Sequence, residues 1–162
     1  MKLITIWPSA AGRGAMRRAA AVPGACLLLS GCLGSPEEQL VTIADARNGP
    51  ATVVDIGPPG DSSGDMVVFD QPLLNAAGDP IGTNSGFCVR TEPGRSYQCQ
   101  WTLSMAEGSI QVAGHEFDQG ESSISIVGGT GAYRSIVGEM ISLKREDGNF
   151  LQTLNYRLGP AN

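Results

Sequence analysis

From residue 40 to residue 158, segments with apolar side chains at every second position alternate with clusters of glycine, proline and asparagine. A period of two is typical of a β-strand that buries one face. No segment shows a clear helical period, so we expect an all-β protein. The pattern predicts strands at residues 40–46, 51–56, 65–71, 84–91, 96–104, 109–116, 122–127, 136–144 and 149–158.

The breaks between these segments carry residues that favour tight turns, such as Asn48-Gly49-Pro50, Pro93-Gly94 and Asp147-Gly148. Because nearly every connection is short, strands that follow one another should pair antiparallel. Evenly spaced antiparallel strands without helices are typical of a sandwich or a closed barrel. The predicted strands form one domain that is long enough to bury its own core.

The N-terminal segment has the layout of a bacterial secretory signal. Arg17 and Arg18 precede a short apolar run that ends in Leu29-Ser30-Gly31-Cys32, which is similar to a lipobox. We therefore expect Cys32 to carry lipid at the outer face of the bacterial cytoplasmic membrane. The alternatives are a secreted protein without an anchor, or an irregular extension in which Ser-Gly-Cys occurs by chance.

The predicted organisation is a signal segment at 1–32, with Met16 as an alternative start, a tether at 33–39 and the folded domain at 40–160. The apolar run of the signal is too short to span a bilayer, so contact with a membrane is expected only through the lipid. Residues 1–32 hold four of the 11 basic residues and none of the 16 acidic ones. The acidic remainder disfavours binding to nucleic acid, because it repels phosphates.

The segment around Pro93-Gly94 predicts a hairpin with a defined register. A loop at Glu92–Arg95 places Cys88 directly opposite Cys99, and in an exported protein we expect these two thiols to form a disulfide. Two buried free thiols are the alternative. The same register pairs Thr91 with Ser96 and Arg90 with Tyr97.

Three polar side chains fall on faces that are otherwise apolar: Glu116, Arg90 and Gln71. An unpaired buried carboxyl group has a raised pKa, which suits a general acid or base. Glu116 is therefore a candidate catalytic residue. Two other interpretations remain: Glu116 reaches water at the end of its strand, or it forms a structural ion pair with Arg90.

Several segments together resemble one superfamily. Gly64–Leu73 followed by Ile81-Gly82 is similar to the opening signature of plant dirigent proteins. Gly86–Val89, Ile110–Gly114 and Ile126–Tyr133 are similar to segments of the allene oxide cyclases. The resemblance covers about residues 40–158 and implies a single antiparallel barrel of eight strands around an apolar cavity. Bacterial members of this barrel family include cyclases that close rings by [4+2] cycloaddition.

The resemblance also implies positions for a pocket. A cavity cysteine of the cyclases falls on Cys88, a pocket asparagine on Gln71, a neighbouring phenylalanine on Phe69 and a pocket tyrosine on Glu116. The polar pair that handles the oxide in the plant enzymes falls near Val41 and Ile43, so allene oxide chemistry itself is not implied. The cavity is expected to be lined by Val67, Phe69, Gln71, Tyr97, Trp101, Leu103, Ile110, Val112 and either Phe150 or Tyr156.

The leading functional hypothesis is a cyclase without a cofactor that folds a polyene or polyketide-like substrate for ring closure. Gln71 and Glu116 would hydrogen-bond a carbonyl group, and Phe69, Val67, Tyr97, Trp101, Leu103, Val112 and Arg90 would surround the substrate. The alternatives are a lipid-anchored protein that only binds apolar molecules, and a dirigent-like auxiliary protein. His115 is the single histidine and is predicted to face outward, so no metal site is expected. The plant relatives also make a homo-oligomer an expectation.

Overall fold

The computed structural model describes residues 35–160, which form nine strands and one short 3-10 helix, η1 (Gly131–Tyr133). The predicted strands are confirmed in number and order, and several are longer than predicted because pairing continues into the turns. The strands are β1 (Glu38–Ala44), β2 (Ala51–Val54), β3 (Met66–Asn75), β4 (Pro80–Glu92), β5 (Ser96–Met105), β6 (Gly108–Phe117), β7 (Glu121–Gly129), β8 (Ile136–Lys144) and β9 (Phe150–Leu158).

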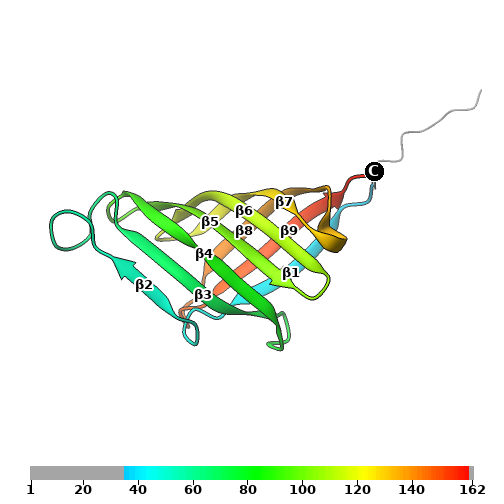
Figure 1. Cartoon of the computed structure of the whole chain (residues 1–162), viewed down its shortest axis with the longest axis horizontal. Helices are drawn as coiled ribbons and strands as arrows, with labels where there is room; N and C mark the ends of the chain where they lie inside the picture. The colour runs from blue at the N-terminus through cyan, green and yellow to red at the C-terminus, as the bar shows by residue number, and fades with distance from the viewer. Residues whose placement is uncertain (1–34, 161–162) are drawn as a thin grey trace, which may run out of the picture. The chain divides into compact units, whose positions relative to one another are not determined.

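Eight of these strands close into an antiparallel barrel (Figure 1). The sheet order is β1-β9-β8-β7-β6-β5-β4-β3, and pairing of β1 with the end of β3 joins the two edges. The barrel expected from the resemblance is confirmed, and the sandwich is excluded. The remaining strand, β2, pairs with the first half of β3, so that β1 and β2 occupy successive parts of the same edge.

Alternation of side chains produces this fold locally. In β7, Ser122, Ile124 and Ile126 are buried, whereas the residues between them are exposed. At one end of the barrel, inward side chains from most strands meet and fill the interior. Burying each of these aliphatic side chains contributes about 1.5–3 kcal/mol of transfer free energy. The fully buried set comprises Leu73, Leu103, Ile110, Val112, Ile124, Met140 and Leu154.

The hairpin register between β4 and β5 confirms the predicted pairs of Cys88 with Cys99 and of Arg90 with Tyr97. Cys88 and Cys99 form a disulfide, with their Cα atoms 4.0 Å apart. The prediction for Ser96 was wrong. The register shifts between Arg90 and Glu92, so that Glu92 and not Thr91 faces Ser96.

The expected signal segment, its alternative start at Met16 and the lipidation of Cys32 lie outside the described residues. The predicted tether was wrong in its last two residues, because β1 begins at Glu38 and pairs there with β9. Among residues 35–160, no helix has the length and apolar character needed to cross a membrane.

Candidate functional site

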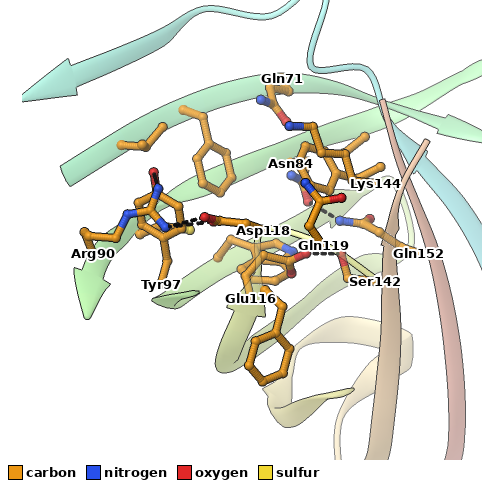
Figure 2. A pocket seen from close by; sticks show the side chains of 17 residues that line it. Gln71, Asn84, Arg90, Tyr97, Glu116, Asp118, Gln119, Ser142, Lys144 and Gln152 are labelled. Carbon is orange, nitrogen blue, oxygen red and sulfur yellow. Dashed lines mark hydrogen bonds and ion pairs between the residues drawn. The ribbon is translucent and has the colours of Figure 1, made fainter. Parts of the chain in front are cut away.

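The part of the barrel that the apolar core does not fill contains a cavity of about 500 Å³. It lies toward the end where β3 and β5 begin and where β4 and β6 finish, and the loop after β6 contributes to its wall. Figure 2 shows this cavity with its polar side chains labelled. The lining residues are Ala44, Val67, Phe69, Gln71, Asn84, Cys88, Arg90, Tyr97, Trp101, Glu116, Phe117, Asp118, Gln119, Ser142, Lys144, Phe150 and Gln152.

One wall of the cavity is apolar and aromatic. Phe69 and Trp101 meet edge to face, with ring centroids 6.4 Å apart. Val67 lies two residues before Phe69 on β3, and the disulfide between Cys88 of β4 and Cys99 of β5 also borders the cavity. Gly86 lies directly opposite Trp101 on β4, where an added Cβ atom would overlap the Cβ and Cα atoms of the tryptophan. The indole N–H of Trp101 has no hydrogen-bond partner within residues 35–160.

The floor of the cavity is polar. Gln71 and Asn84 face each other across β3 and β4. The hydroxyl of Thr42 donates to Oε1 of Gln152 at 2.9 Å, and Nε2 of Gln152 donates to Oδ1 of Asn84 at 3.3 Å. The amide N–H groups of Asn84 form no hydrogen bond to any residue between 35 and 160, so they can donate into the cavity. Gln71 is 7% exposed, because the loop before β2 crosses over it at Gly49.

Glu116 is the only carboxyl group of the lining that has no cation beside it in the described part of the chain. Its Oε1 accepts a hydrogen bond from Ser142 at 3.0 Å, and its Oε2 is buried without a partner. Burial raises the pKa of Glu116 to about 7, although the hydrogen bond from Ser142 and the nearby hydroxyl group of Ser122 act in the opposite direction. At neutral pH a large fraction of this group is therefore a carboxylic acid, which can donate a hydrogen bond.

The ion pair between Arg90 and Glu116 that one interpretation required is not formed. Arg90 instead donates two hydrogen bonds to Asp118, at 2.7 and 2.9 Å, and its Nε lies 2.7 Å from the carboxylate of Asp61. The guanidinium carbon lies 3.6 Å from the ring centroid of Tyr97. Arg90 thus joins two loops at the cavity through contacts that satisfy its charge.

Most of the predicted pocket is brought together. The residues on the cavity wall are Val67, Phe69, Gln71, Arg90, Tyr97, Trp101 and Glu116, together with Phe150. The prediction was wrong for Leu103, Ile110 and Val112, which are fully buried in the core. They point inward as predicted, but they lie deeper in the barrel, where apolar side chains from opposite strands touch. Tyr156 is likewise part of the core.

Sequence reasoning missed six polar lining residues: Asn84, Asp118, Gln119, Ser142, Lys144 and Gln152. Asn84 has the same alternation phase as Cys88 and Arg90, and Gln152 falls between the inward-facing Phe150 and Leu154. The signal that singled out Gln71 was therefore present at Asn84 and Gln152 also. His115 is exposed, and no group of metal-binding side chains occurs among residues 35–160.

The sequence pattern of one family, the dirigent-like proteins, matches residues 32–156. The chain belongs to the dirigent-like protein family. None of the curated proteins matches its sequence.

Solved structures with the same fold include proteins of different activity. A pyocyanin demethylase is 23% identical, with a TM-score of 0.62 over 75% of this chain and 99% of its own. A pterocarpan synthase dirigent protein is 16% identical, with a TM-score of 0.63 over 78% of this chain and 97% of its own. The Diels-Alderase AbmU from Streptomyces koyangensis is 20% identical, with a TM-score of 0.63 over 82% of this chain and 72% of its own. At these identities the likeness establishes the fold alone.

Proposed function

We propose that this dirigent-like protein is a cyclase that needs no cofactor and closes a ring in a flexible, largely apolar substrate. The observation that carries the proposal is a carboxyl group, Glu116, whose pKa is raised to about 7 and which lies on the wall of a cavity that also carries aromatic and amide side chains. The fold likeness to [4+2] cyclases agrees with this activity.

The cavity would act first by restricting the shape of the substrate. Val67, Phe69 and Trp101 offer an apolar wall against which a polyene can lie folded. Holding two reacting ends in contact can lower a barrier by up to about 7–11 kcal/mol in favourable cases. An intramolecular [4+2] closure exchanges two π bonds for two σ bonds and releases nothing, so no other reactant is needed.

Glu116 would act second, as a hydrogen-bond donor. The protonated carboxyl group donates to a carbonyl oxygen conjugated with the reacting double bonds, and negative charge develops on that oxygen as the bonds form. The proton stays on Glu116 throughout. Removing one such preorganised donor typically lowers turnover by about 10²–10³-fold. Ser142 would hold the other oxygen of Glu116 in place through the hydrogen bond described above.

Two variants of Glu116 test this role. Glu116→Gln keeps a donor of similar shape but cannot ionise, whereas Glu116→Ala removes the donor. With a linear polyene that carries a conjugated ketone, we expect the wild-type rate to fall as the pH rises through about 7. The Gln variant should retain a rate that does not depend on pH, and the Ala variant should be slower by about 10²-fold. Equal rates for all three proteins would overturn the proposal.

A protein that only binds apolar molecules is the second candidate, and the lipobox-like sequence ending at Cys32 favours it. An anchored binding protein would hold the same ligand in the same cavity and release it unchanged. Incubation with the linear substrate separates these functions. A single stereoisomer of a cyclic product indicates a cyclase, and unchanged ligand that is protected from solvent indicates a binding protein. A coupling that proceeds only with an added oxidase would indicate a dirigent-like auxiliary role.

A further inference from the structure

The cavity contains amide N–H groups that form no hydrogen bond to any residue between 35 and 160. Gln71 is 93% buried, yet its side-chain amide makes no hydrogen bond to any residue between 35 and 160. Asn84, its cross-strand neighbour, has its oxygen occupied by Gln152 and its N–H groups free. Because both side chains line the cavity, their N–H groups are open to its interior and can donate to a molecule bound there.

One cation on the same cavity is also without a partner. Lys144 is the last residue of β8, and within the described part of the chain no carboxylate lies in ion-pair range of its amine. It is the only lysine after Lys2. Figure 2 shows Lys144 on the side of the cavity that carries Gln71 and Asn84, away from Arg90.

The charges around the cavity favour an anion on that side. On the other side, Arg90 is paired with two carboxylates, Asp61 and Asp118, so that this group of three carries one surplus negative charge. Glu116 is mostly uncharged below neutral pH. Lys144, which is exposed, is therefore the cation of the lining that pairs with no carboxylate within residues 35–160, in a chain whose overall charge is −5.

We propose that Gln71, Asn84 and Lys144 form a subsite for a carboxylate at one end of an amphipathic ligand, whose apolar body lies against Phe69 and Trp101. A carboxylate only accepts hydrogen bonds, so it matches a set of groups that can all donate. This inference rests on the proposed function in assuming that the cavity holds an apolar ligand, and it restricts the substrate class to elongated carboxylic acids.

The test compares two probes of the same length, dodecanoate and dodecan-1-ol, bound to the purified full-length protein at pH 6 and measured by calorimetry. Dodecanoate should bind the wild-type protein about tenfold or more tightly than the alcohol, because its hydrogen bonds are charge-assisted. Lys144→Met keeps the apolar stem of the lysine and removes its charge. This variant should bind dodecanoate about three- to tenfold more weakly than the wild-type protein does, and its affinity for the alcohol should be unchanged. Gln71→Leu should also weaken dodecanoate.

The matched control is Arg145→Met, which removes the same charge from the next residue, where the arginine pairs with Asp147 outside the cavity. Its affinity for both probes should equal that of the wild-type protein. A weaker affinity for dodecanoate in this control would reveal a general effect of net charge. Equal affinity for the two probes, with no effect of Lys144→Met, would overturn the subsite and leave the proposed function standing. Failure of both probes to bind the wild-type protein would overturn both.

Discussion

The state of Glu116 predicts how the stability of the protein depends on pH. Burial raises the pKa of this carboxyl group from an ordinary value of 4.5 to about 7 in the folded protein. Between these two values the folded state holds a proton that the unfolded state has lost. The stabilisation from this difference is fully present below about pH 4.5 and is lost as the pH rises through about 7. Its full size is about 3 kcal/mol.

Glu116→Gln removes this dependence, because glutamine is neutral at every pH. Relative to the wild-type protein, the variant should therefore gain about 3 kcal/mol in the free energy of unfolding between pH 4 and pH 8. Over the same pH range, the melting temperature of the variant should rise by about 10 °C relative to that of the wild-type protein, for a domain of this size. Urea unfolding followed by tryptophan fluorescence at several pH values measures it. Other titrating groups contribute equally to both proteins and cancel.

Glu121→Gln serves as the control, because it removes the same charge from an exposed position at the start of β7. This variant should follow the wild-type protein at every pH. If Glu116→Gln and the wild-type protein lose stability in parallel from pH 4 to pH 8, Glu116 titrates as an ordinary exposed carboxyl group. The reasoning from burial would then be wrong.

Three further predictions follow from packing. Replacing both Cys88 and Cys99 by serine should lower the free energy of unfolding by about 2–3 kcal/mol in urea, because the bridge closes a loop with a sequence separation of 11; an unchanged midpoint would contradict this. Leu103→Ala, in the filled end of the barrel, should cost about 3–5 kcal/mol of stability but alter ligand affinity less than Val67→Ala, which lies on the cavity. A larger loss of ligand affinity in Leu103→Ala than in Val67→Ala would show that the ligand does not bind beside Val67. Arg90→Met should lower the free energy of unfolding by about 1–3 kcal/mol, because it leaves Asp118 without its hydrogen bonds. Thermal unfolding measures this loss, and an unchanged melting temperature would contradict the prediction.

The strands and the hairpin register could be predicted because they depend on local patterns. Alternating apolar residues fix which face of a strand is buried. The pair of Cys88 and Cys99 was predicted correctly, although the register shift between Arg90 and Glu92, which brings Glu92 opposite Ser96, was not. Closure of the barrel depends on pairing between β1 and β3, which are distant from this hairpin and carry no local signal for it. The resemblance to a known family supplied that part.

The depth of each inward side chain could not be read from alternation. Leu103 and Trp101 share one face of β5, yet only Trp101 borders the cavity. Whether an inward side chain meets the filled core or the cavity depends on residues from opposite strands, such as Met140 and Leu154. The positions of these residues follow only from the closed barrel. For the same reason, the choice of Asp118 as partner for Arg90 required the structure, because a loop residue has no alternation phase.

The proposed function requires a neutral Glu116 carboxyl group that contacts a ligand inside the cavity. Carbon-13 NMR of the glutamate carboxyl groups measures this directly, with Glu116→Gln used to assign the signal, before and after addition of a neutral long-chain enone. We expect a pKa of about 7 without the enone and a higher value with it, since the enone accepts a hydrogen bond from the protonated form and excludes water. A pKa near 4.5 that the enone leaves unchanged would contradict the account.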